Sequence, residues 1–216
     1  MIELKNINKS FKDEKVLKNI NLKANKSEII AIEGKSGAGK TTLLKIIGKL
    51  EEPDSGIIYF NNQNITSLNN KELQIFRSNT IGFIFQFHYL LPEFNALENI
   101  CMPAYINKKQ TNETFQRALE LMRILNIDSK KNSFPEQMSG GEKQRVAIAR
   151  SLINNPDIVL ADEPTGNLDS IQSIELYNLF NSLRKKFNQT FLIVTHDKEL
   201  SKLTDRKLYL KDGEIT

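Results

Sequence analysis

Hydrophobic and polar residues alternate along the first part of the chain, and this pattern is typical of strands. Residues 2–11 and 16–24 both alternate, and the charged turn Lys12-Asp13-Glu14 separates them, which predicts an antiparallel pair. Shorter apolar runs predict strands at 28–32, 57–60, 157–161 and 189–195, and residues 206–216 predict a strand, a tight Asp212-Gly213 turn and a short extended piece.

Helical patterns occupy longer segments, at 40–50, 95–106, 112–126, 139–154 and 170–187. Pro156 ends the fourth of these helices. The fifth lies between two expected strands, and strand–helix–strand is the unit of a parallel sheet. The sequence therefore predicts an α/β fold in a single domain over residues 1–216. An antiparallel β layer forms its N-terminal part, and a helical part is inserted at about residues 86–155.

The composition excludes several classes of protein. Cys101 is the one cysteine, so the chain forms no internal disulfide or multi-thiolate metal site, and its apolar neighbours predict burial. The net charge of +4 comes with scattered lysines, so we expect no nucleic-acid partner. No apolar run approaches the roughly 18 residues that cross a bilayer, and residues 1–14 lack the apolar part of a signal peptide. We expect a cytoplasmic protein unless a membrane partner holds it.

A glycine-rich segment lies between the first buried strand and the first helix. Its sequence, Gly34-Lys-Ser-Gly-Ala-Gly-Lys-Thr41, fits the P-loop pattern G-x-x-x-x-G-K-[ST]. The glycines let backbone N–H groups turn around a phosphate, and the helix N-terminus adds the positive end of its dipole. Lys40 is expected to reach the β- and γ-phosphates, and Thr41 to offer its hydroxyl to Mg²⁺. A chance glycine-rich turn would not explain this context, so we predict a P-loop NTPase with a RecA-like core.

Two carboxylates end the strand expected at 157–161. Parallel sheets bind ligands at such strand ends, so Asp162 is expected to hold Mg²⁺. Glu163 is expected to polarise the attacking water as a general base. The alternative is a strand that simply ends in a polar turn, and the P-loop upstream favours the functional interpretation.

Two further polar residues also follow apolar runs. His196 follows the strand expected at 189–195, where it could reach the γ-phosphate. Gln86 follows the run 81–85, where its amide oxygen could bind Mg²⁺ or hold the water. Taken alone, each of these residues would be assigned a structural or surface role.

Together these motifs resemble the ABC ATPase family over nearly the whole chain. The diagnostic segment, Met138-Ser-Gly-Gly-Glu142, is similar to the LSGGQ signature, with Met for Leu and Glu for Gln. Ser139 is expected to cap the helix that follows, and Gly140 and Gly141 to expose N–H groups as a second anion site. In the family this motif binds the γ-phosphate held by the other protomer. The resemblance thus implies a head-to-tail homodimer with ATP sandwiched between protomers.

The resemblance also implies roles for single residues. Gln86 would belong to the Q-loop, His196 would be the switch histidine, and Asn167-Leu168-Asp169 would form the D-loop. Phe11 would stack on adenine, with a core or edge aromatic as the alternative. The residues expected at ATP are Phe11, Gly34, Lys35, Ser36, Gly37, Ala38, Gly39, Lys40, Thr41, Thr42, Ser139, Gly140, Gly141, Glu142 and Asp169. Those expected at Mg²⁺ are Thr41, Gln86 and Asp162, and the expected catalytic residues are Glu163, His196 and Gln86.

A finer resemblance rests on residues 85–100, Phe-Gln-Phe-His-Tyr-Leu-Leu-Pro-Glu-Phe-Asn-Ala-Leu-Glu-Asn-Ile, which are similar to a stretch of the lipoprotein-releasing ATPases of the LolD group. Segments 161–169 and 211–216 also fit that group. The resemblance implies an ATPase that powers lipoprotein release, held peripherally on the cytoplasmic face of the inner membrane by separate permease subunits (LolC/LolE-like). Segment 161–169 is shared with MacB-type exporter ATPases and with FtsE-like division ATPases that regulate cell-wall hydrolases, so both remain alternatives.

In the family, a helix of the membrane subunit docks beside the Q-loop. Apolar residues that could form this socket, or belong to the core, are Phe87, Tyr89, Leu90, Leu91 and Phe94.

Overall fold

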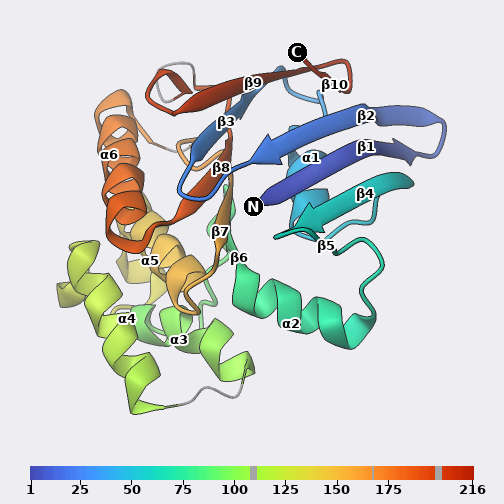
Figure 1. Cartoon of the computed structure of the whole chain (residues 1–216). Coiled ribbons are helices and arrows are strands. Elements are labelled where there is room, and N and C mark those ends of the chain that lie inside the picture. Colours follow the sequence, from blue (N-terminus) through green and yellow to red (C-terminus); the bar gives the residue numbers. More distant parts are fainter. Residues whose placement is uncertain (108–110, 167, 198–200) are drawn as a thin grey trace.

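A computed structural model describes residues 1–107, 111–166, 168–197 and 201–216, and two sheets organise them (Figure 1). The first is antiparallel, with strand order β2-β1-β4-β5. The charged turn lies between its first two strands, as the alternation predicts, and Ile2 pairs with Ala24 at the other end of the hairpin. Its strands are β1 (Ile2–Phe11), β2 (Glu14–Ala24), β4 (Ser55–Phe60) and β5 (Gln63–Asn64).

The second sheet has six strands in the order β10-β9-β3-β8-β7-β6. All neighbouring strands are parallel except β10, which pairs antiparallel with β9. The strand–helix–strand unit predicted near the end of the chain is confirmed, because β7 and β8 pair in parallel on either side of α6 in sequence. The strands are β3 (Ile29–Glu33), β6 (Ile81–Ile84), β7 (Ile158–Asp162), β8 (Thr190–Val194), β9 (Arg206–Lys211) and β10 (Glu214–Ile215).

Helices cover both faces of the six-stranded sheet. In Figure 1, α1 lies between the two sheets, whereas α3, α4, α5 and α6 lie on the opposite side of the parallel strands. The helices are α1 (Lys40–Ile47), α2 (Asn70–Thr80), α3 (Ala96–Ile106), α4 (Asn112–Ile124), α5 (Gly140–Leu152) and α6 (Ser170–Phe187), with short 3₁₀ turns at Asp128–Lys130 and Pro135–Gln137. None of the helices in the described parts of the chain combines the length and the apolar character needed to cross a bilayer.

The parallel strands alternate between two hydrophobic cores. Leu192 and Val194 of β8 belong to the core that α1 shares with the antiparallel sheet, whereas Phe191 and Ile193 belong to the core under α3–α6. Both faces of the strand are therefore buried, which explains why its sequence is a continuous apolar run. Cys101 lies in the helical core with no exposed surface, as its apolar neighbours predict.

The helix α2 was not predicted from the sequence. None of its residues is fully buried, and Phe76 packs only partly against the core. Its sequence therefore carries only a weak apolar stripe. The available signal was its cap: the Asn69 side chain accepts from the backbone N–H of Glu72, and the Glu72 carboxylate accepts from the N–H of Asn69. The helices α3, α4 and α5 lie between β6 and β7 in sequence. The boundaries of an inserted helical part at about 86–155 stay a prediction.

Gly48 ends α1 where that helix packs on the sheet, and the fit there is tight. A Cβ atom at this position would lie 2.0 Å from Cζ of Phe83 and 3.0 Å from Cδ1 of Leu160. We expect Gly48→Val to lower the free energy of unfolding by about 1–3 kcal/mol, because the added atoms displace packed side chains. Urea denaturation of the two proteins measures this difference.

A double variant identifies the contact responsible. The cost of Gly48→Val should shrink in a Phe83→Ala background, because the smaller side chain leaves room for the added methyl groups. Equal costs in both backgrounds would show that contact with Phe83 is not the cause.

Candidate functional site: a nucleotide cavity with an acidic strand end

The P-loop connects β3 to α1, and two of its glycines are required by their surroundings. A Cβ atom on Gly34 would lie 2.3 Å from the carbonyl oxygen of Leu210, so the backbone passes too close to β9 for any side chain. Gly39 immediately precedes α1 with φ 98°, a left-handed conformation that favours glycine. The first N–H groups of α1 have no intrahelical partner, and no side chain caps them from Gly39. They remain available to an anion.

Lys40 is held inside the P-loop. Its Nζ donates to the carbonyl oxygens of Gly34, at 2.8 Å, and Lys35, at 3.2 Å. The same ammonium lies 3.8 Å from Oε1 of Glu163, and the whole residue is 8% exposed. A cation that is partly desolvated in this way interacts strongly with nearby negative charge. The P-loop thus presents a positive charge toward the acidic end of β7.

Thr41 and Asp162 meet as the sequence predicts. The Thr41 hydroxyl donates to Oδ1 of Asp162 at 3.1 Å. Burial raises the pKa of Asp162, the Thr41 hydrogen bond lowers it, and the neighbouring Glu163 charge raises it. A carboxylate and a hydroxyl are hard oxygen ligands that suit Mg²⁺.

The donor set fits Mg²⁺ in the form that nucleotide sites use. Within the described residues, no three or more His, Cys, Asp or Glu side chains gather into a metal cage. Mg²⁺ commonly binds through one or two protein ligands and completes its shell with water and substrate phosphates. Thr41 and Asp162 would supply such a pair of protein ligands.

Glu163 has an unusual backbone that turns its side chain toward β8. Its φ is 45°, a left-handed conformation that is uncommon for a residue with a Cβ. Its N–H donates to the carbonyl oxygen of Val194 at 2.9 Å, which fixes the turn to the neighbouring strand. Its Oε2 accepts from the backbone N–H of His196 at 3.1 Å and lies 2.8 Å from Nδ1 of that ring. Two contacts to His196, which follows β8, therefore orient the Glu163 carboxylate.

One cavity of about 640 Å³ collects most of the predicted site. It brings together the P-loop, Gln86, Glu163 and His196, and Gln86 lies against Gly166, whose Cβ position is 3.2 Å from Nε2 of the glutamine. The lining residues are Val16, Gly34, Lys35, Ser36, Gly37, Gly39, Lys40, Thr41, Thr42, Gln86, Glu163 and His196. Ala38 does not line it and lies instead in the wall of a neighbouring cavity of about 480 Å³.

Phe11, like Ala38 and Asp162, lies outside the lining of the nucleotide cavity. It is 46% exposed, and Nζ of Lys9 lies 5.1 Å from its ring centroid. It is not among the residues that line the nucleotide cavity, so its role in adenine stacking stays a prediction. Val16 supplies the apolar lining there. This role was not predicted from the sequence, because it depends on how β2 passes over the P-loop.

The signature segment forms a regular helix start. Ser139 caps α5 by accepting from the N–H of Glu142 at 3.3 Å, and Glu142 accepts in return from the N–H of Ser139 at 2.8 Å. A Cβ atom on Gly140 or Gly141 would meet nothing within 4 Å, so both glycines face open space. The glycines leave the backbone of this helix start accessible to an anion.

The glutamate that replaces the usual glutamine has two partners. Besides the Ser139 N–H, Glu142 forms an ion pair with Lys130 at 3.1 Å. The hydrogen bond to the Ser139 backbone, followed by the contacts to Lys130, holds the pKa of Glu142 below its ordinary value, against the effect of burial. A carboxylate therefore suits this position. Lys130 was not singled out in the sequence, since only the folded chain brings it to the signature.

The signature and the P-loop line different cavities. Ser139, Gly141 and Glu142 line a cavity of about 210 Å³ together with Leu168, and no described residue is common to it and the nucleotide cavity. Asp169 caps α6 by accepting from the N–H of Gln172 at 2.8 Å. Asn167 of the expected D-loop lies outside the described residues. A single chain therefore does not bring its own signature to its own P-loop.

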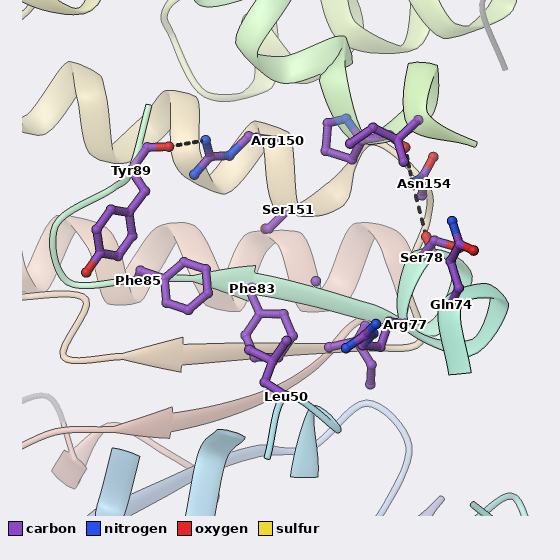
Figure 2. Close-up of a pocket in the computed structure, with 14 residues that line it drawn as sticks. Leu50, Gln74, Arg77, Ser78, Phe83, Phe85, Tyr89, Arg150, Ser151 and Asn154 are labelled. Atoms are coloured by element: carbon purple, nitrogen blue, oxygen red, sulfur yellow. Dashed lines mark hydrogen bonds between the residues drawn. The ribbon is translucent and has the colours of Figure 1, made fainter. Parts of the chain in front are cut away.

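A third cavity, of about 470 Å³, is an apolar groove between α2, β6, α3 and α5 (Figure 2). Phe83 and Phe85 stack along it with centroids 5.4 Å apart, and Tyr89 meets Phe85 edge-on at 5.5 Å. The lining residues are Leu50, Gln74, Arg77, Ser78, Ile81, Gly82, Phe83, Phe85, Tyr89, Pro103, Ile106, Arg150, Ser151 and Asn154. This set contains two arginines and no acidic residue.

The residues expected to form a socket fall into two groups. Phe87 and Tyr89 are 65% and 63% exposed, and Leu91 is 39% exposed. Leu90 packs against the helical core, and Phe94 is half-buried. Every second residue of the segment 87–91 thus presents an apolar side chain to solvent.

Comparisons with known proteins agree with this geometry. The family model "ABC transporter" matches residues 17–166. The "Lipoprotein-releasing system ATP-binding protein LolD" of Bacteroides fragilis (strain YCH46) is 51% identical over 215 residues, covering 100% of both chains. A solved structure, "Dimeric Structure of MJ0796, a Bacterial ABC Transporter Cassette", has a TM-score of 0.91 and 41% identity, covering 100% of this chain and 96% of that one.

A second solved structure of the same cassette, "Dimeric structure of a post-hydrolysis state of the ATP-binding cassette MJ0796 bound to ADP and Pi", has a TM-score of 0.90 and 40% identity over 100% of this chain and 96% of that one. The predicted fold class is confirmed by these likenesses. The P-loop, the acidic strand end and the signature helix are thus those of an ATP-binding cassette, and the chain belongs to the ABC transporter family, among proteins similar to LolD.

Proposed function

We propose that this chain hydrolyses ATP as the nucleotide-binding subunit of a lipoprotein-releasing ABC transporter. The observation that carries the proposal is the single cavity shared by the P-loop, Gln86, Glu163 and His196. The name of the Bacteroides fragilis relative supports lipoprotein release as the process that ATP hydrolysis drives.

The residues divide the chemistry among them. The P-loop N–H groups and Lys40 bind the phosphates, and Thr41 with Asp162 would hold Mg²⁺, which when bound neutralises phosphate charge. Glu163 takes a proton from the attacking water as general base. The His196 contacts at 2.8 and 3.1 Å orient that carboxylate, and Gln86 reaches the same space from the end of β6.

The active site is shared between two copies of the chain. The signature glycines face open space, away from the P-loop of their own chain. A phosphate held by one P-loop can meet a signature helix start only if a second copy supplies it, and the dimeric cassettes at a TM-score of 0.91 and 0.90 support this arrangement. ATP is then sandwiched in a homodimer, with Ser139, Gly140, Gly141 and Glu142 as the contribution of the second protomer.

The membrane partner docks on the apolar groove and the exposed segment 87–91. This surface is large, apolar and rimmed by polar residues, as interaction sites are. The partner is a separate integral permease of the LolC/LolE kind. Because the subunit has no spanning helix of its own within its described parts, the permease holds it peripherally at the cytoplasmic face of the inner membrane.

Replacing the proposed general base tests the chemistry. Glu163→Gln keeps the size of the side chain and removes its basicity, so we expect kcat for ATP hydrolysis to fall by about 10²–10⁴-fold. Binding of a fluorescent ATP analogue should persist, because the P-loop is unchanged. Near-normal phosphate release by Glu163→Gln would contradict the assignment.

Mixing two inactive variants tests the shared site. Lys40→Ala disables the P-loop, and Gly141→Asp places a negative charge on the open signature surface without a clash. In a mixed head-to-tail dimer, one of the two sites then has both an intact P-loop and an intact signature. We expect the mixture to regain about a quarter of the wild-type ATPase rate if subunits exchange at random.

The control pair is Lys40→Ala with Glu163→Gln. Both changes damage the part of the shared site that contains the P-loop, and each protomer of a mixed dimer carries one of them. Every mixed dimer therefore has two defective sites. Recovery in this control, or none in the first mixture, would refute the two-copy active site.

Leu91→Asp tests the docking surface. The Leu91 N–H donates to Oδ1 of buried Asn99 at 2.8 Å, and the Leu91 carbonyl oxygen accepts from Nδ2 of Asn99 at 3.0 Å. The Leu91 side chain is 39% exposed. The change should therefore leave the fold intact and weaken association with the permease. Tagged chains carrying Glu163→Gln, with and without Leu91→Asp, are purified from membranes with Mg·ATP, and the bound proteins are identified by mass spectrometry.

We expect integral membrane proteins and lipoproteins with the first chain and a loss of about tenfold or more with the second, as for a removed interface anchor. Leu203→Asp is the matched control, since Leu203 is 42% exposed and lies outside the groove. Equal recovery of the permease with Leu91→Asp would argue against this surface. A division-type partner with regulators of cell-wall hydrolases would argue against lipoprotein release.

A further inference from the structure

The helix α5 connects the signature to the groove, and its C-terminal end holds the groove walls. Its first turn carries Gly140 and Gly141, and its far end carries Arg150, with Asn154 two residues beyond the helix. Figure 2 shows the Arg150 side chain directed at the backbone of Tyr89 and Asn154 directed at Ser78.

Arg150 hydrogen-bonds to a loop, residues 88–89, that has an unusual backbone conformation. Its NH1 donates to the carbonyl oxygen of Tyr89 at 2.7 Å, and its NH2 donates to the carbonyl oxygen of His88. His88 and Tyr89 have φ values of 59° and 45°, so two successive residues with a Cβ adopt the left-handed conformation. Such a conformation persists only where the surroundings impose it. The planar fork of an arginine can hold two adjacent carbonyl groups at once, which a lysine cannot do as well.

The same loop meets α5 at a second point. The His88 side chain interacts with Gln144, a buried residue two positions after Glu142 of the signature. Burial lowers the pKa of His88, the interaction with Gln144 opposes this, and the positive charges of Lys143 and Arg150 lower it further. The loop thus lies along α5, and Arg150 holds it at the end of the helix.

Asn154 joins two more walls of the groove, α2 and α3, to the end of α5. Its Nδ2 donates to the carbonyl oxygens of Ser78, at 3.0 Å, and Pro103, at 3.3 Å. Both carbonyls lie in the last turns of their helices, α2 and α3, where helix carbonyls lack an intrahelical donor. A single amide therefore caps two helices, and the loop 88–89, α2 and α3 are all hydrogen-bonded to the end of α5.

We propose that Arg150 and Asn154 are positioning residues that couple the signature to the groove through α5. The inference rests on the proposed function, in which the signature meets ATP held by a second copy. A helix moves nearly as a rigid body, so displacement of the Gly140 end is delivered at the other end to the loop 88–89 and to α2 and α3. Gln86 lies two residues before this loop and lines the nucleotide cavity, so the link also reaches the ATP site.

The test compares partner-stimulated with unstimulated ATP hydrolysis. Arg150→Lys keeps the charge and loses the two-carbonyl fork, and Asn154→Ala removes the shared cap. Each variant is reconstituted in lipid vesicles with the permease recovered from membranes. We expect the ratio of the stimulated to the unstimulated rate of ATP hydrolysis to fall about fivefold or more. A factor of about five is the lower end of the range found for coupling between distant sites. Arg117→Lys is the control, because this arginine is similarly enclosed by Glu120 and Phe187 but lies away from the groove.

A spectroscopic readout separates positioning from general damage. The chain has two histidines, so the NMR signals of the His88 imidazole ring are assigned by comparison with the His196→Ala variant. In Arg150→Lys we expect the His88 pKa to rise toward its ordinary value as the loop leaves its buried place, and in Arg117→Lys we expect no change. If one test variant fails to show a cooperative thermal transition, the other decides.

The outcomes are distinct. A stimulation ratio that stays at the wild-type value in the folded variants overturns the coupling proposal, even where the His88 signal moves. A ratio that falls equally in Arg117→Lys also overturns it, because the effect is then not specific to the groove. Wild-type chain that hydrolyses no ATP would overturn the proposed function itself, and the coupling proposal with it.

Discussion

The parallel pairing of β3, β8 and β7 is the constraint on which the site depends. Ile32 pairs with Val194, and Val194 pairs with Asp162, so the three strands end at the same level. Each strand is followed within two residues by a part of the candidate site: the P-loop, His196 and Glu163. Residues separated by more than a hundred positions in sequence are thereby fixed to one edge of one sheet. A slip of one residue in either pairing would exchange the faces of the strand, and both hydrophobic cores resist such a slip.

The charges at this edge hold one another in place. The Lys40 ammonium is nearly buried, yet it has two carbonyl partners and a carboxylate within 3.8 Å. Asp162 is paired with Thr41, and Glu163 with His196. A buried charge without such partners would be costly, so each group constrains the position of the next. The left-handed turn at Glu163 belongs to the same arrangement, because its carboxylate contacts His196 beyond the end of β8.

Local sequence patterns predicted the parts of this site that are contiguous in the chain. The P-loop, the Asp162–Glu163 pair and the signature helix start each depend on neighbouring residues, and their local geometry is as predicted. The contributions of Val16, Lys130 and Arg150 were not predicted, because each depends on contact with a segment distant in sequence. The helix α2 was not predicted because none of its residues is fully buried and Phe76 packs only partly against the core, so its cap is the clearest signal. For Phe11 the structure shows a contact with Lys9, and its stacking on adenine, which the family pattern implies, stays a prediction.

The arrangement of α5 accounts for the two kinds of partner that we propose for the chain. Its N-terminus faces open space with its glycines bare, and its C-terminal end holds the walls of an apolar groove that is also open. Bare helix N–H groups attract an anion, and an exposed apolar groove attracts another protein. One rigid element therefore connects a surface suited to the phosphate of a second copy with a surface suited to a membrane subunit. Because Arg150 and Asn154 hydrogen-bond to backbone carbonyls of the loop 88–89, α2 and α3, we expect displacement of one surface to shift the other.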